Sequence, residues 1–330
     1  MKVYVHKDST IRDVCDIREE RYYSVEYLKT LPDNTIQIIP IKYDDTYFLD
    51  YIKQSNATII LENLVEGGDT FMRMLDNQGL LKGALNGRYA TISSGELPES
   101  INNFNTNYMM YKTAEVNEHN KYVAYSRHER DYDFLFLNNR PRAHRVKLIK
   151  QLEKQGLLES ALWTNITEGR RLPREFEKND ITFESLIDWQ RWDAGECIIP
   201  QYFDTYFSLQ AESSVLHRYS FFTEKTWKPI IANHNWITLG AQNHYDELRK
   251  LGYEVPKWEW TNLERWQDRL KGCIEQIKIQ KEYGLHQWEI DTRPERRHNQ
   301  DVFWKQYDEY YWTTRQELEQ WFSDLGGDIY

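Results

Sequence analysis

The chain has 330 residues and a formal net charge of −10 at pH 7. An acidic balance of this size excludes an overall basic field that would attract nucleic acid, although a local basic groove is compatible with it. The length suffices for two α/β domains of ordinary size, each with its own core.

Cysteine usage and hydropathy indicate where such a chain would work. Cys15, Cys197 and Cys273 are isolated and show none of the paired spacings of a disulfide or zinc framework. No apolar run approaches the length of a transmembrane helix, and the first residues predict a strand rather than a signal peptide. We therefore expect a cytoplasmic protein without a membrane partner.

The first part of the chain alternates short apolar runs with short helical patterns. The run at residues 57–61 is apolar throughout, as in a parallel strand buried on both faces. Predicted strands lie at residues 3–6, 36–40, 57–61, 89–93, 107–111 and 122–125, and predicted helices at 24–31, 47–54 and from 67–69 onward. This alternation predicts a doubly wound α/β domain over residues 1–130.

A charged segment at residues 127–131 marks the predicted domain boundary. Strands are predicted after it at residues 134–137, 162–164, 206–210 and 236–240, with long helices at 262–283 and 299–322. Residues 166–200 are irregular and charged. The sequence predicts a second α/β domain over residues 131–298 and an aromatic-rich C-terminal helix over 299–330, which we expect to pack back on the first domain.

A basic element opens the second predicted domain. Pro141 suits the first position of a helix that Gly156 ends, and the stripe that buries its apolar residues continues as Arg142 and Arg145 at the N-terminal end. Cations there oppose the helix dipole, which costs a few tenths of a kcal/mol each. A bound diphosphate would offset that cost, and Arg can hold phosphate oxygens bidentately.

A second helix start follows at residues 220–232. Thr223 can serve as N-cap, which places Glu224 and Lys225 in a first turn whose free N–H groups favour an anion. Pro229 removes the N–H that would bond the Lys225 carbonyl, so we expect a bend or local opening of this helix.

The segment Thr-Glu-Lys-Thr-Trp-Lys-Pro, followed by a strand and a Leu-Arg-Lys-Leu-Gly helix, resembles the donor-binding segment of family 10-type (fucosyltransferase-like) glycosyltransferases and their relatives in large phages. The resemblance implies that Glu224 meets the nucleotide ribose, that Lys225 meets the phosphates, and that Arg145 contacts the donor diphosphate. It covers mainly residues 134–155 and 206–255. Because Golgi-type fucosyltransferases carry a membrane anchor and none is predicted here, the resemblance also implies a bacterial or viral setting.

The resemblance also implies a GT-B-like fold, in which two Rossmann-like domains face a cleft and the second binds a nucleoside-diphosphate sugar without metal. The expected donor-binding residues are Asn138, Arg142, Arg145, Glu212, Thr223, Glu224, Lys225 and Lys228. Lys228-Pro229 departs from the cellular fucosyltransferases, so the donor base and the sugar stay open. The acceptor is expected to be a glycan hydroxyl or, by analogy with the phage relatives, a hydroxymethylated DNA base.

Transfer with inversion needs a carboxylate to deprotonate the acceptor. Glu96 is the favoured candidate, because Ser-Gly-Glu-Leu-Pro loosely resembles the strand, Gly-Glu and loop that carry the base in this family. Glu62 and Glu66 are the alternatives.

Other functions predict different features. Asp131-Tyr132-Asp133 has the letters of a metal-binding DxD motif, but it precedes an apolar strand instead of following one. A non-catalytic protein that binds a nucleotide sugar or a glycan would bind donor without turnover. A nucleic-acid-binding protein would use the 140–147 cluster, with a steep salt dependence.

Overall fold

The computed structural model of the chain describes residues 2–7, 9, 11, 22–41, 48–64, 68–94, 97–118, 121, 129–138, 141–165, 169–170, 198–213, 215–216 and 221–326. These residues form two compact units. Unit 1 comprises Met1–Met109 and Asp308–Tyr330, and unit 2 comprises Met110–Tyr307.

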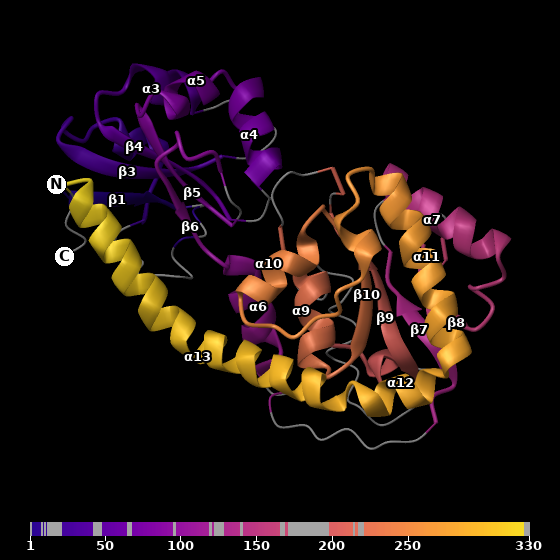
Figure 1. Cartoon of the computed structure of the whole chain (residues 1–330). Coiled ribbons are helices and arrows are strands. Elements are labelled where there is room, and N and C mark those ends of the chain that lie inside the picture. Colours follow the sequence, from indigo (N-terminus) through magenta and orange to yellow (C-terminus); the bar gives the residue numbers. More distant parts are fainter. Residues whose placement is uncertain are drawn as a thin grey trace. The chain divides into compact units, whose positions relative to one another are not determined.

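Unit 1 contains a parallel sheet of strand order β2-β1-β3-β4-β5-β6 (Figure 1). Its strands are β1 (Lys2–His6), β2 (Tyr22–Tyr23), β3 (Thr35–Pro40), β4 (Thr58–Asn63), β5 (Tyr89–Ser93) and β6 (Asn103–Asn105). Its helices are α2 (Val25–Leu28), α3 (Leu49–Gln54), α4 (Gly68–Asn77) and α5 (Leu81–Leu85).

The middle strands of this sheet are buried along almost their whole length, as strands covered on both faces must be. Successive side chains alternate between the faces, so Ile39, Ile59 and Leu61 join Phe71 and Leu75 in one core cluster.

Unit 2 contains a parallel sheet of order β10-β9-β7-β8. Its strands are β7 (Tyr132–Phe136), β8 (Ala161–Trp163), β9 (Thr205–Ala211) and β10 (Asn235–Leu239). Its helical elements are α7 (Ala143–Lys154), η7 (Pro200–Tyr202), α9 (Glu224–Ile231), α10 (His244–Lys250), η8 (Glu259–Asn262), α11 (Trp266–Tyr283) and α12 (Leu285–Asp291). Two helices run across the unit bounds, α6 (Tyr108–Val116) and α13 (Arg293–Asp324).

Both faces of the unit 2 sheet are covered. Phe134 and Phe136 lie in the core cluster that α7, α11 and α12 complete, whereas Leu135, between them in sequence, packs with Tyr202 and Ala232 in a separate cluster. This alternation along β7 is the period-two pattern of a strand.

The predicted mixed α/β chain with parallel sheets is confirmed, and among the described residues no helix is both long and apolar enough to cross a membrane. The predicted strand at residues 107–111 is wrong, because those residues begin helix α6. The predicted strand at 122–125 lies outside the described residues.

The end of α13 packs within unit 1. Trp321 packs on Phe104 with ring centroids 5.7 Å apart and planes tilted by 45°, and its indole N–H donates to Asn102 Oδ1 at 3.1 Å. Tyr310 and Thr106 share a hydrogen bond between their hydroxyl groups. Aromatic side chains of the predicted C-terminal helix therefore fill the surface beside β6.

Candidate functional site

The strand order of unit 2 defines where a ligand would bind. From β7 the chain moves to β8 on one side, and then to β9 and β10 on the other. In open α/β sheets, ligands bind beyond the carboxyl ends of the strands at the point where this direction reverses. That point lies between β7 and β9. Asn138 follows β7 and Glu212 follows β9, so both lie at this edge.

Helix α7 starts against the turn that follows β9. Arg142 is its N-cap residue, and the Arg142 guanidinium donates to the Ser213 carbonyl. Arg145 is 4% exposed and donates from Nε to the Ala211 carbonyl at 3.1 Å. The buried stripe predicted for this helix is confirmed, because Ile149 is also buried. Both arginines are thus held at the carboxyl edge of β9.

His144 adds a third contact to the same turn. Its Nε2 lies 2.9 Å from the Glu212 carbonyl, which can only accept, so the imidazole carries its proton on Nε2. Burial is the largest cause that lowers the pKa of His144, the contact to the Glu212 carbonyl raises it, and the neighbouring Arg145 and Arg142 lower it, which together give a pKa of about 4. The imidazole is therefore neutral at pH 7.

Helix α9 starts at the opposite side of this turn. Thr223 is its N-cap residue and accepts from the Lys225 N–H at 3.3 Å, which confirms the predicted cap. Glu224 and Lys225 form an ion pair. Burial alone would raise the pKa of the Glu224 carboxyl, but Lys225 and Lys228 outweigh it and hold the pKa below its ordinary value. Glu224 is therefore ionised at pH 7, within a turn that carries two cations.

Glu212 connects the two helix starts. It is 1% exposed, and its carboxylate accepts from Thr223 Oγ1 at 2.8 Å and from Thr226 Oγ1 at 2.6 Å, with the Ser213 N–H at 3.2 Å. His244 closes the cluster, with Nε2 at 3.5 Å from Thr226 Oγ1. A buried carboxylate needs such donors. Since each of its oxygens accepts from a threonine, Glu212 fixes α9 against the turn after β9.

Pro229 does not interrupt α9, which is a continuous helix through that residue. The Lys225 carbonyl, left without its usual N–H partner, accepts from Gln210 Nε2. Gln210 Oε1 in turn accepts from Thr238 Oγ1 at 3.0 Å. One side chain from β9 thus satisfies the helix and ties it to β10.

Two further predicted residues lie close by in the fold. Asn138 is 2% exposed and donates its backbone N–H to Thr164 Oγ1 at 2.8 Å, while its side-chain Oδ1 has no partner among the described residues. Lys228 is buried in α9, and its charge acts on Glu224.

The three candidates for the acceptor base belong to unit 1. Glu96 and Glu66 lie outside the described residues. Glu62 lies at the end of β4, is 1% exposed, and accepts a hydrogen bond from Ser9 Oγ. Burial of the Glu62 carboxylate leaves it little access to an acceptor.

The two aspartates that match the DxD motif lie at the opposite edge of the unit 2 sheet from the candidate site. Asp131 and Asp133 lie at the start of β7, at the amino edge, where Asp133 pairs with Lys281 at 2.5 Å and accepts from Ser160 Oγ. The Asp133 carboxylate therefore serves an ion pair, far along the strand from the candidate site.

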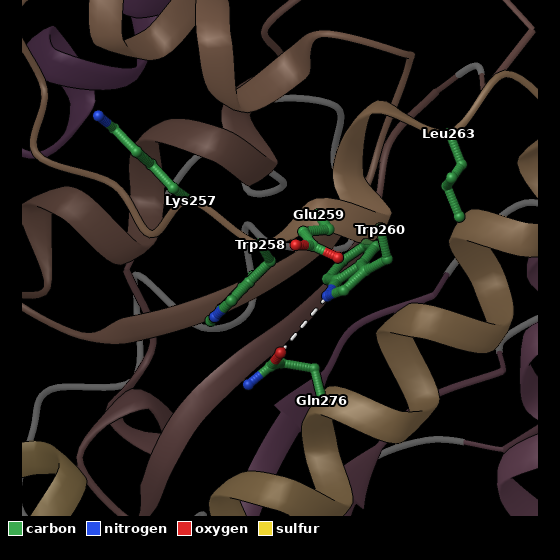
Figure 2. Close-up of a pocket in the computed structure, with 6 residues that line it drawn as sticks. All are labelled: Lys257, Trp258, Glu259, Trp260, Leu263 and Gln276. Atoms are coloured by element: carbon green, nitrogen blue, oxygen red, sulfur yellow. Dashed lines mark hydrogen bonds between the residues drawn. The ribbon is translucent and has the colours of Figure 1, made fainter.

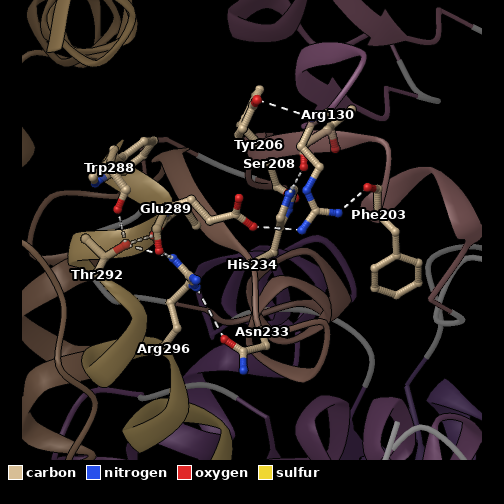
Figure 3. A network of polar contacts seen from close by, with 12 residues as sticks. Arg130, Phe203, Tyr206, Ser208, Asn233, His234, Trp288, Glu289, Thr292 and Arg296 are labelled. Carbon is tan, nitrogen blue, oxygen red and sulfur yellow. Dashed lines mark hydrogen bonds and ion pairs between the residues drawn. The ribbon is translucent and has the colours of Figure 1, made fainter. Parts of the chain in front are cut away.

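A buried polar network also closes this amino edge (Figure 3). Arg130 Nη2 pairs with Glu289 Oε1 at 2.7 Å, and the Glu289 carbonyl accepts from Arg296 Nη1 at 2.7 Å. Arg296 Nε also donates to Asn233 Oδ1 at 3.3 Å. Burial lowers the pKa of Arg296 to about 10, so it stays charged at pH 7. We assign this network to stability, because it lies opposite the ligand edge.

The structure thus brings the starts of α7 and α9 onto the turn after β9. Of the predicted donor-binding residues, Arg142 and Arg145 donate to carbonyls of this turn, and Thr223 donates to Glu212 within it. Sequence reasoning missed the anchoring contacts of Thr226, His144 and Gln210. For Thr226 the available signal was a polar residue in the first turn after the N-cap Thr223. No local sequence pattern indicates the contact of Gln210.

No protein-family model matches the chain, and no curated protein matches its sequence. The functional assignment therefore rests on the residues and geometry of unit 2.

Proposed function

We propose that the chain is a metal-independent, GT-B-like glycosyltransferase that transfers a sugar from a nucleoside-diphosphate sugar to a hydroxyl acceptor with inversion. The observation that carries the proposal is the meeting of two helix starts at the switch point of the unit 2 sheet. Helix N-termini carry free N–H groups and a partial positive charge, which suit phosphate.

The charges of the site fit a diphosphate. Arg142, Arg145, Lys225 and Lys228 supply four positive charges, against the carboxylates Glu212 and Glu224. The four positive charges exceed the two negative charges by two, which matches the charge of a diphosphate dianion. Cations aimed at a departing diphosphate stabilise the charge that develops on it during transfer.

The proposal divides the roles as follows. Lys225 and Arg145 stabilise the leaving diphosphate, and Glu224 accepts hydrogen bonds from the ribose hydroxyls. Glu212 holds α9 in place through Thr223 and does not itself contact the donor. The acceptor base is a carboxylate of the first domain, and burial of Glu62 favours Glu96.

A thermal-shift panel of nucleosides, nucleoside diphosphates and nucleotide sugars tests the donor site. A diphosphate at about 100 times its Kd stabilises the folded protein by about 2.7 kcal/mol, which raises the melting temperature by roughly 5–11 °C in a domain of this size, at about 2–4 °C per kcal/mol. Nucleosides, which lack phosphate, should give little shift.

Lys225→Met should remove most of the diphosphate shift, because it deletes a cation at the helix start. Lys278→Met is the matched control: Lys278 is an exposed lysine on α11 whose ammonium pairs with Glu275. The proposal fails if no diphosphate stabilises the protein, or if both variants retain the same shift.

A non-catalytic nucleotide-sugar-binding protein would give the same thermal shifts. Release of nucleoside diphosphate from the stabilising donor, with and without Glu96→Ala, separates the two. Donor binding without turnover in any acceptor mixture would favour the binding protein.

A further inference from the structure

Unit 2 has a hollow on the segment between α10 and α11, lined by none of the residues of the two helix starts (Figure 2). Its cavity volume is about 460 Å³, within the range of about 300–1,000 Å³ found for small-ligand sites. It is lined by Lys257, Trp258, Glu259, Trp260, Leu263 and Gln276.

Two indole rings form one wall of this hollow. Trp258 and Trp260 lie with ring centroids 5.7 Å apart and planes only 15° from parallel. Both pack on the ring of Tyr245, and Leu263, which is 43% exposed, adds an apolar rim. The two indoles are therefore stacked on one another, and the wall that they form is aromatic.

The indole wall is held rigidly. A Cβ added to Gly272 would lie 2.2 Å from Trp260 Cβ, so the tryptophan lies directly against the backbone of α11. Glycine inside a helix costs about 1 kcal/mol relative to alanine. Its presence here is explained by the close approach of Trp260, which leaves the indole little freedom to lose on binding a ligand.

Polar groups flank the indoles on either side. The Trp260 indole N–H can only donate, and it lies 3.4 Å from Gln276 Oε1, so the Gln276 amide keeps Nε2 as a donor. The Glu259 carboxylate lies beside Trp260 and has no hydrogen-bond or ion-pair partner among the described residues (Figure 2). The Lys257 ammonium extends away from the indoles (Figure 2).

We propose that this hollow is a saccharide-binding site, formed by Trp258, Trp260, Glu259 and Gln276. The C–H face of a pyranose ring is flat and apolar and packs on indole, while its hydroxyls can donate to Glu259 and accept from Gln276.

Other ligand classes fit less well. A cation of the trimethylammonium type is best held by aromatic rings that surround it, whereas these two rings are nearly parallel and stack on one another, so they do not form a cage. An anion would meet the unpaired Glu259 carboxylate.

The site is separate from the candidate donor site and does not depend on the proposed function. Tyr245 packs against both tryptophans, and its neighbour His244 reaches Thr226 of the donor site at 3.5 Å. The two sites thus contact neighbouring residues of the first turn of α10 and share no side chain.

The full-length chain labelled with 5-fluorotryptophan tests the proposal by ¹⁹F NMR. The 12 tryptophans give 12 signals. The signal lost in Trp258→Phe and the signal lost in Trp260→Phe identify those two residues. The probes are glucose, galactose, mannose, N-acetylglucosamine, maltose, cellobiose and chitobiose, with choline and a nucleoside diphosphate as comparisons. At least one saccharide should shift the Trp258 and Trp260 signals saturably.

Glu259→Ala should weaken that saccharide about tenfold or more, since a hydrogen bond to a charged group is lost, and Gln276→Ala about threefold. Glu264→Ala, at an exposed carboxylate just beyond the hollow, is the matched control and should leave binding unchanged. The melting temperature of each variant reports whether it folds.

Three outcomes overturn the proposal: no saccharide shifts the two signals, choline shifts them and saccharides do not, or Glu264→Ala weakens binding as much as Glu259→Ala. The donor proposal is judged separately by the thermal shift with nucleoside diphosphates, so either can fail alone.

Discussion

Thr226→Val tests whether the buried Glu212 carboxylate anchors α9. Thr226 is fully buried and donates to Glu212 Oε1 at 2.6 Å, and valine has nearly the same shape without the donor. Hydrogen bonds to charged groups contribute about 1.5–3 kcal/mol. We expect the substitution to lower the free energy of unfolding of unit 2 by about 2 kcal/mol.

The expected cost of Thr226→Val depends on the charge of Glu212, and a double-mutant cycle isolates the contribution of that charge. In a Glu212→Gln background the threonine hydroxyl bonds to a neutral amide, and Thr226→Val should then cost only about 1 kcal/mol. The coupling energy between the two substitutions should be about 1 kcal/mol, well above the roughly 0.3–0.5 kcal/mol within which independent sites add.

Thr238→Val is the matched control. Thr238 is equally buried, but its hydroxyl donates to the neutral Oε1 of Gln210 at 3.0 Å. It should cost about 1 kcal/mol and show no coupling to Glu212→Gln.

Urea unfolding followed by tryptophan fluorescence measures these energies, because residues 1–109 contain no tryptophan and the signal comes mainly from unit 2. Additive effects of Thr226→Val and Glu212→Gln would refute the anchoring role of Glu212.

Three further predictions concern packing and protonation. Gly272→Ala should destabilise unit 2 by about 1–3 kcal/mol in urea unfolding, because the new Cβ would collide with Trp260; unchanged stability would contradict the close contact. Burial lowers the pKa of His234 to about 3, so the unfolded chain binds more protons below pH 6.5 and stability falls with falling pH, by up to about 1.4 kcal/mol per unit between pH 6 and 4. His234→Gln should reduce that slope, although the buried His144 keeps part of it, and an equal slope in both proteins would be inconsistent with the prediction. Tyr310→Phe should lower the melting temperature of unit 1 modestly, through loss of about 1 kcal/mol from the hydrogen bond with Thr106; calorimetry that shows no change would argue against that contact.

The parallel strands of unit 2 could be predicted because local sequence determines them. The runs around Phe134 and Ile237 are apolar and short, and the polar Thr223 directly before an amphipathic turn marks a cap. The strand predicted at residues 107–111 is wrong because a short, mostly apolar run fits a strand or a buried helix equally well, and local sequence does not decide between them.

Contacts between distant residues could not be predicted. Glu212 was expected to bind donor, and its position after β9 was right, but only the structure shows that Thr223 and Thr226 occupy its oxygens. Arg130 lies in a segment that was predicted as a charged linker, whereas it forms an ion pair with Glu289, 159 residues later in the chain. Charge in a sequence does not distinguish a solvated side chain from a buried pair.

The bond from Gln210 to the Lys225 carbonyl has a consequence for how this sequence can vary. With proline at 229, a residue at 210 that cannot donate would leave a peptide oxygen unsatisfied in the interior. If 229 became an ordinary helix former, its own amide would take that oxygen and position 210 would lose the constraint. Homologous chains should therefore vary at 210 and 229 together, a covariation between a strand and a helix that neither element would reveal alone.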